Sequence, residues 1–211
     1  MTADATPSAS SAEGRPAADQ ARTERADAAR NRAKILTTAE ELVAEYGVTA
    51  LSMNSVAAAA GVGVGTVYRR FTDHAGLVEA LMDHRETQLQ EDMRSGPPPL
   101  GPGAPPIERI KAFLHAYVDV LEFYAPLMAE AERTMARARR YRSGPYAVHH
   151  RHLADLITEA APKADAHYLA DALLAPLAAG LFTYQRHEEG LELHRIRAGL
   201  DALVEGIGTL R

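Results

Sequence analysis

Cysteine is absent from the 211 residues of this chain, and so is any long apolar run. Without cysteine the chain has no disulfide framework, no thiolate nucleophile and no cysteine-ligated zinc site. No uninterrupted apolar stretch approaches the roughly 18 residues that a membrane-spanning helix needs. The first residues contain Asp4 and Glu13 rather than a basic start followed by an apolar run, which is unlike a secretory signal. We therefore expect a cytoplasmic protein that has no membrane segment.

The motifs of common enzyme classes are missing as well. The sequence has no glycine loop with a lysine for nucleotide phosphates, no GxSxG elbow and no HExxH zinc motif. Its carboxylates fall mostly at helix caps or at exposed helix positions rather than beside a nucleophile and a base. We expect no enzymatic activity and no cofactor.

Strand-like alternation is also missing, whereas apolar residues recur at helical spacing along most of the chain. The first helix is expected to begin at Asp27, after a disordered tail of residues 1–26 with no large apolar residue beyond Met1. A Pro/Gly-rich loop is expected over 94–106, and Pro126 is expected to end a helix. These features predict an all-α fold of about nine helices.

The formal net charge of −5 argues against a protein that coats nucleic acid indiscriminately, but one segment is locally basic. Between Arg15 and Lys34 there are six basic residues and three acidic ones. A basic arm beside a DNA-binding unit can follow phosphates. Arg30, Arg32 and Lys34 lie closer to the first helix and are the better candidates for such a contact, whereas Arg15 to Arg25 are expected in a solvated tail.

The segment from Ser52 to Phe71 has the pattern of two short helices joined by a glycine turn, which is the form of a helix-turn-helix. The apolar residues of the first helix recur at three and four positions and share one face. Gly61 can adopt the left-handed conformation that ends a helix. The second helix, residues 64–70, is short and polar, and a helix of this kind can lie in the DNA major groove. An ordinary helical hairpin has the same outline, so the pattern alone leaves that alternative open.

Several residues of this segment suit DNA contacts. Gly65 permits close backbone approach, and a helix N-terminus attracts phosphate. Hydroxyl groups donate to phosphate, and arginine binds phosphate or guanine at two points. The candidate DNA contacts are Ser52, Gly65, Thr66, Tyr68, Arg69, Arg70, His74 and Arg32.

Residues 35–81 resemble the tetracycline-repressor (TetR) family of one-component bacterial regulators. The resemblance is carried by the turn Ala60-Gly61-Val62, by the run Gly65-Thr66-Val67-Tyr68-Arg69-Arg70-Phe71 and by the capped helix that contains Leu77. It implies a DNA-binding domain over 27–73 and a ligand-binding and dimerisation domain over 74–211. It further implies a homodimer, most simply a repressor, that a small-molecule effector releases from a palindromic operator in double-stranded DNA.

Three positions depart from the family pattern. Gly63 and Val64 stand where the family usually has serine and then a basic or polar residue, and His74 stands where it usually has lysine. Gly63 removes a side-chain cap, Val64 removes a polar contact, and His74 carries less positive charge at neutral pH than lysine. The departures keep one alternative open, a helical small-molecule-binding protein with lost or altered DNA recognition.

The carboxyl-terminal part supplies the expected effector site and dimer interface. Its last two helices, expected around Leu169–Leu181 and Ile196–Leu210, are apolar on more than one side and are expected to pair across a two-fold axis. Aromatic rings with polar tips and adaptable methionines suit an apolar or aromatic effector. The candidate lining residues are Phe113, Tyr117, Phe123, Tyr124, Met128, Met135 and Leu177.

A run of histidines offers a different kind of signal. On a helix, His149, His152 and Asp155 recur at three-residue spacing and share a face, a pattern that can hold zinc or nickel. Surface histidines produce the same pattern by chance. A metal-responsive regulator that uses these three residues is therefore kept as an alternative, and no metal is assigned.

Overall fold

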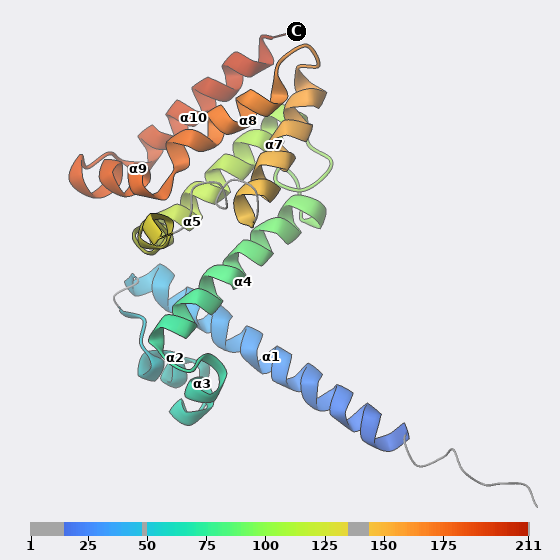
Figure 1. Cartoon of the computed structure of the whole chain (residues 1–211), viewed down its shortest axis with the longest axis vertical. Helices are drawn as coiled ribbons and strands as arrows, with labels where there is room; N and C mark the ends of the chain where they lie inside the picture. The colour runs from blue at the N-terminus through green and yellow to red at the C-terminus, as the bar shows by residue number, and fades with distance from the viewer. Residues whose placement is uncertain (1–14, 48–49, 135–143, 211) are drawn as a thin grey trace, which may run out of the picture.

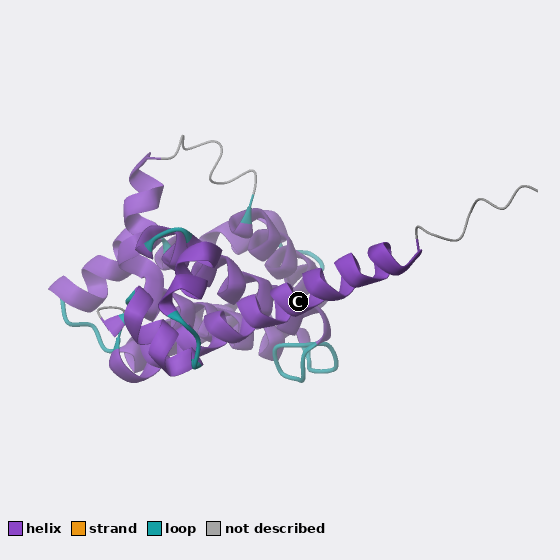
Figure 2. Cartoon of the chain, turned by 90° about the horizontal axis from the view of Figure 1, so that it is seen from below, coloured by secondary structure: helices purple, strands orange, loops and turns teal. Residues whose placement is uncertain are grey.

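The structure is a computed structural model that describes residues 15–47, 50–134 and 144–210. These residues fold into helices joined by turns and loops, without strands (Figures 1 and 2). The expected all-α class is therefore confirmed. In order, the elements are α1 Arg15–Tyr46, α2 Met53–Ala60, α3 Val64–Phe71, α4 His74–Ser95, α5 Pro106–Thr134, α7 Pro145–Ala160, α8 Ala166–Leu174, the 3-10 turn η2 Ala175–Leu177, α9 Ala179–Thr183, the π-helical turn η3 Tyr184–Glu188 and α10 Leu193–Gly208.

The first helix begins at Arg15, which is earlier than the expected start at Asp27. Residues 15–26 are thus part of a helix and not of a disordered tail. Most of them are alanine, arginine, glutamate or glutamine, which have high helix propensity. Disorder was expected because this segment lacks large apolar residues, without regard to that propensity. In Figure 1 this part of α1 extends away from the rest of the molecule.

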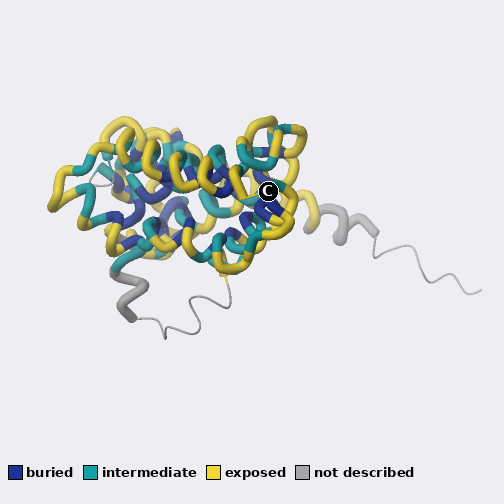
Figure 3. Tube along the Cα trace, turned by 90° about the horizontal axis from the view of Figure 1, so that it is seen from above, coloured by how far each residue is buried: buried dark blue, intermediate teal, exposed yellow. Residues whose placement is uncertain are grey.

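Two groups of helices can be followed in Figure 1. The small group is formed by α2, α3, the first turns of α4 and the last turns of α1. The larger group contains α5 and α7 to α10, and α4 connects the two. Buried residues run through the interior of both (Figure 3), including Ile35, Val56 and Val67 in the small group and Phe113 and Phe182 in the larger one.

Pro126 does not end a helix, in contrast to the expectation. It lies inside α5, which continues to Thr134. A proline inside a helix loses one backbone hydrogen bond and costs about 3 kcal/mol. Its neighbours Tyr124 and Ala125 are buried in the core, so tertiary packing opposes the local break. The separate sixth helix expected from Leu127 therefore begins as part of α5, and residues 135–143 lie outside the described residues.

The expected single helix from Leu169 to Leu181 is also wrong. It is interrupted after Leu174 by η2, where Pro176 lacks a backbone donor, and Ala178 is extended with φ −61° and ψ 129°. The chain then continues as α9 and η3. This break turns the chain so that α9 packs on α5 while α8 packs on α7.

One stretch of the described residues, Ala166–Glu188, is long and apolar enough to cross a membrane by length and composition alone. It is not a continuous helix, because η2 and the extended Ala178 interrupt it. It carries charged side chains at Asp171 and Arg186, and its segments pack on α7 and α5. Its apolar character is that of the helical core to which it belongs.

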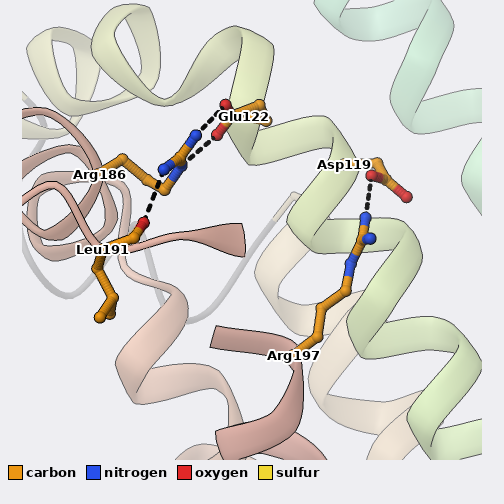
Figure 4. Close-up of polar contacts among 5 residues, drawn as sticks. All are labelled: Asp119, Glu122, Arg186, Leu191 and Arg197. Carbon is orange, nitrogen blue, oxygen red and sulfur yellow. Dashed lines mark hydrogen bonds and ion pairs between the residues drawn. The ribbon is translucent and has the colours of Figure 1, made fainter. Parts of the chain in front are cut away.

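A row of four ion pairs joins α5 to the last elements of the chain. Successive turns of α5 present Lys111, His115, Asp119 and Glu122, which meet Glu205, Asp201, Arg197 and Arg186, respectively. The Arg186–Glu122 pair is bidentate, at 2.7 and 2.6 Å, and Arg186 also donates to the backbone oxygen of Leu191 at 2.7 Å (Figure 4). The row aligns α10 antiparallel to α5 and sets its register.

Candidate DNA interface and effector pocket

The start of α2 is fixed by a reciprocal cap between two serines. The Ser52 hydroxyl accepts from the Ser55 backbone N–H at 3.0 Å, and the Ser55 hydroxyl accepts from the Ser52 N–H at 2.9 Å. Glutamate usually fills the second role, and the shorter Ser55 fills it here. The Ser52 hydroxyl is thus part of the cap, at an exposed position at the start of α2.

The turn between α2 and α3 depends on Gly61. Its φ of 68° is in the left-handed region, and the following Val62 N–H donates to the Ala57 oxygen at 3.0 Å. This pairing satisfies carbonyl groups at the end of α2. Gly63 precedes α3 and provides no side-chain cap. The Thr66 N–H donates to the Gly63 backbone oxygen at 2.8 Å.

Helix α3 separates a packed face from an exposed one. Val67 and Phe71, four residues apart, are buried and anchor the helix to the core. Gly65, Tyr68, Arg69 and Arg70 are exposed, Thr66 is half-buried, and Tyr68 has 50% of its surface accessible. The predicted DNA-contacting residues of α3 therefore lie on its accessible side.

The Arg69 side chain folds back along α3. Its Nε donates to the Gly65 backbone oxygen at 3.3 Å, and its Nη2 donates to the Thr66 hydroxyl at 3.4 Å. These long contacts at an exposed site are weak, so the guanidinium can exchange them for a phosphate or a base edge. The arrangement gathers Gly65, Thr66 and Arg69 in one place near the start of the helix.

The corner between α3 and α4 is tight. Thr72 has a φ of 64°, which is rare for a β-branched residue, and the Asp73 N–H donates to the Phe71 oxygen at 2.7 Å across it. Gly76 passes so close that a Cβ there would lie 2.2 Å from the same oxygen. The Asp73 carboxylate caps α4 by accepting from the Gly76 N–H at 2.8 Å. The angle between α3 and α4 is therefore closely set.

Two further candidates for phosphate contacts have partners within the protein. The His74 Nε2 lies 2.9 Å from the Leu51 backbone oxygen and joins the start of α4 to the segment that leads into α2. The Arg32 guanidinium lies 5.4 Å from the centre of the Phe71 ring, beside the end of α3. Both side chains are exposed and lie on the same small group of helices as α3.

A cavity of about 100 Å³ lies between α4, α5 and the start of α7. Its walls are mostly apolar or aromatic, with two carboxylates from α4. The lining residues are Met82, Asp83, Glu86, Tyr117, Val120, Tyr124, Met128 and Pro145. Burial raises the pKa of Tyr124 to about 12, and the nearby Glu40 charge adds to this, so the hydroxyl stays protonated. The cavity is well below the roughly 300 Å³ of a typical ligand site.

The predicted lining residues divide between this cavity and the core. Tyr117, Tyr124 and Met128 line it, whereas Phe123 lines a neighbouring depression with Tyr124. Phe113 and Leu177 are buried in the core and are not among the residues that line this cavity. Met135 lies outside the described residues.

Sequence reasoning missed the most buried polar contact of the site. His149 of α7 is 1% exposed, and its Nε2 lies 3.0 Å from the Glu86 carboxylate of α4. Burial raises the pKa of Glu86, but hydrogen bonds from His149 and Gln90 and the His149 charge outweigh it and hold the pKa below its usual value. Glu86 and His149 are 63 positions apart, so no local pattern could have paired them.

The metal group of His149, His152 and Asp155, which was kept as an alternative, is not assembled. His152 and Asp155 line a shared surface depression, but His149 points away from it toward Glu86. Within the described residues, the structure brings together a different group, His150, His167 and Asp171. His167 and Asp171 are four residues apart on α8, a spacing visible in the sequence, but their proximity to His150 depends on how α7 packs on α8.

Comparison with known proteins gives matches to the helix-turn-helix part. Residues 35–81 match the family model described as bacterial regulatory proteins, tetR family. An HTH-type transcriptional regulator of Staphylococcus aureus strain MRSA252 is 41% identical over 70 residues, which cover 32% of this chain and 36% of that protein. Another, from strain USA300, is 45% identical over 53 residues, 25% of this chain and 29% of that protein. The similarity thus spans about a third of these relatives.

Solved structures extend the similarity to the larger helical group, as a similarity of fold. A TetR-family transcriptional regulator from Rhodococcus sp. superposes with a TM-score of 0.58 at 24% identity, over 85% of this chain and all of that one. The regulator FadR from Bacillus subtilis, solved in complex with stearoyl-CoA, superposes with a TM-score of 0.54 at 17% identity, over 84% of this chain and 98% of that one. The helix-turn-helix segment of this chain thus matches the tetR family of bacterial regulatory proteins, and the chain shares its fold with these solved structures.

Proposed function

We propose that this protein is a DNA-binding transcriptional regulator, a repressor that a small molecule releases from a palindromic operator. The observation that carries the proposal is the two-sided α3. Val67 and Phe71 fix it to the core, while Tyr68, Arg69 and Arg70 are exposed. A positioned helix with exposed arginines and a glycine in its first turn is suited to enter the major groove.

The proposed active form is a homodimer. An exposed apolar surface runs over the last elements of the chain and includes Leu181, Tyr184 and Leu203. Gly199 and Gly206 of α10 have open space where a Cβ would be, so a second helix can approach closely. Two-fold pairing of this surface would present two copies of α3 to successive major grooves, about 34–36 Å apart or a multiple of that.

The proposed effector site is the cavity beside Tyr117, Tyr124 and Met128. These side chains favour a largely apolar or aromatic molecule, and Asp83 and Glu86 would accept hydrogen bonds from it. Because the cavity holds only about 100 Å³, such a ligand must separate α4 from α5 and α7 in order to fit. Binding would then favour a different position of α4. The resulting loss of operator affinity can be no larger than the ratio of the ligand's affinities for the two conformations, with α4 moved and with α4 in its present position.

The test is fluorescence anisotropy on DNA from upstream of the protein's own gene, at several salt concentrations, with a scrambled fragment as reference. The native chain should bind the first fragment selectively and more weakly as salt rises. Arg69→Ala should lose about 1–3 kcal/mol of binding free energy. Gly65→Ala should also weaken DNA binding, because the added methyl group would hinder close approach of the backbone to DNA. The fold itself has open space for that methyl group, so stability should not change.

Arg94→Ala is the matched control, because Arg94 is an exposed arginine in the last turn of α4, far from α3. It should bind the operator as the native chain does. Equal, weak binding to both fragments by the native chain, with operators from neighbouring genes also failing, would contradict the proposal and favour a ligand-binding protein without DNA recognition. An established operator complex then serves to screen apolar and aromatic compounds for release.

A further inference from the structure

We propose that His150, His167 and Asp171 form a binding site for one divalent transition-metal ion of the zinc or nickel type, between α7 and α8. The inference is independent of DNA binding and of the effector cavity. It rests on three observations: the approach of the three side chains, the space in front of them, and the contacts that orient them.

The three side chains come from two packed helices. One candidate ligand atom of each residue lies within 4.8 Å of those of the other two. His167 and Asp171 are one turn apart on α8 and so share a face. The rings of His150 and His167 meet edge to face with their centres 4.4 Å apart. Small side-chain rotations bring three such atoms to the distances of about 2.0–2.2 Å that zinc needs.

The side chains face an open space of about 760 Å³. Its described walls are Tyr146, Ala147, His150, Arg151, Ala154, His167 and Asp171. Water or a small ligand in this space can complete a four-coordinate shell around two imidazoles and one carboxylate. Arg151 is the one arginine or lysine among these walls, and its exposed position lets water screen its charge. The positive charge of Arg151, even when screened, opposes a bound cation. We therefore expect the site to bind a metal ion with micromolar rather than nanomolar affinity.

Neighbouring groups hold two of the proposed ligands in place. The Tyr146 hydroxyl donates to one Asp171 carboxylate oxygen at 2.6 Å, and the other oxygen of that carboxylate can meet a metal. The His150 Nε2 lies 3.1 Å from the His167 backbone oxygen and 3.5 Å from Asp171. Such contacts orient metal ligands in many proteins. Two imidazoles favour zinc, nickel or copper over magnesium and calcium, which prefer oxygen ligands.

The test is titration calorimetry of the full-length, untagged protein with zinc chloride at pH 7.5. We expect one zinc ion per chain. His167→Ala and Asp171→Asn should each weaken binding by at least about 10-fold, the lower limit for losing even an orienting contact. Binding should also weaken as the pH falls toward 5.5, because protonated imidazole cannot bind a metal.

His167→Ala separates metal binding from folding. The contact with His150 uses the backbone oxygen of His167, so the variant retains it, and its metal-free circular dichroism spectrum should match that of the native chain. His194→Ala, an exposed histidine on α10, is the control and should bind zinc unchanged. No heat at micromolar zinc, or equal binding by His167→Ala and the native chain, would overturn the proposal.

Discussion

At the scale of single residues, two histidines one turn apart on α7 have opposite surroundings. His149 has a carboxylate partner in Glu86. The Nε2 of His152 is buried and has no hydrogen-bond partner within the described chain, and the ring lies 5.5 Å, centre to centre, from Phe113. Burial, together with the nearby Arg109 and His149 charges, lowers the pKa of His152 from 6.5 to about 4.

This shift predicts how stability depends on pH. Between pH 6.5 and about 4, the unfolded chain binds a proton at His152 that the folded chain does not bind. Stability from this residue is therefore present above pH 6.5 and is lost as the pH falls toward 4. His152→Leu keeps the apolar contact with Phe113, and we expect a flatter dependence of the free energy of unfolding in this range. Urea unfolding at several pH values measures it, and an unchanged slope would refute the assignment.

Residues whose role is local were predicted well from the sequence. Gly61, Val67 and Phe71 have the conformation or burial that their spacing indicates, because a turn and a helix face depend on neighbours within a few positions. The partners of Glu86 and His150 could not be predicted in this way. They depend on contacts of α7 with α4 and with α8, which only the folded chain defines.

At the scale of elements, the ion pairs along α5 hold the end of the chain in register. We expect Arg186→Ala to lower the free energy of unfolding by about 2 kcal/mol, because Glu122 loses a bidentate partner and the Leu191 oxygen loses a donor (Figure 4). The loss is measured by urea unfolding. Adding Glu122→Ala should recover part of it, since no carboxylate is then left without its partner.

If the double variant were no more stable than Arg186→Ala, the loss would come from packing of the arginine stem and not from the ion pair. The same measurement with Lys111→Ala gives a reference, because Glu205, its partner, is largely exposed. Such an exposed pair contributes little to stability, because water and salt screen its charges. The two variants thus compare the more buried Arg186–Glu122 pair with the more exposed Lys111–Glu205 pair.

The helical class and most helix positions followed from apolar spacing, whereas the errors concern three boundaries. The start at Arg15 was missed because intrinsic propensity formed a helix without a core to pack on. Pro126 was expected to end a helix, but the burial of Tyr124 and Ala125 just before it outweighs the lost hydrogen bond. The break at Pro176 was missed because the apolar pattern continues across it. Packing overrides the local preference at Pro126, whereas the local preference decides at Arg15 and at Pro176.

At the scale of the whole molecule, the exposed apolar surface of α9 and α10 is the feature that a single chain leaves uncovered. Leu203 is 53% exposed on α10, next to the open faces of Gly199 and Gly206. We expect Leu203→Glu to give a monomer in light scattering, because pairing would bury two carboxylates. The monomer should bind the operator much more weakly, since each chain then reaches only one half-site.

Val148→Glu is the matched control, because Val148 is an exposed aliphatic residue on α7. It should keep the oligomeric state of the native chain. A Leu203→Glu protein that stays dimeric would place the interface elsewhere on the surface.

The shape of α4 has a mechanical consequence. Its far end is fixed, since the Arg109 guanidinium donates to the Met93 oxygen at 3.2 Å and a Cβ on Gly101 would lie 1.8 Å from the Gly96 oxygen. Its near end carries α3 through the tight corner at Thr72. With 22 residues it is about 33 Å long, so a tilt of about 5° about the fixed end moves the near end by about 3 Å. A rigid α4 would thus act as a lever, and a displacement at Glu86 near its middle would be roughly doubled at the end that carries α3.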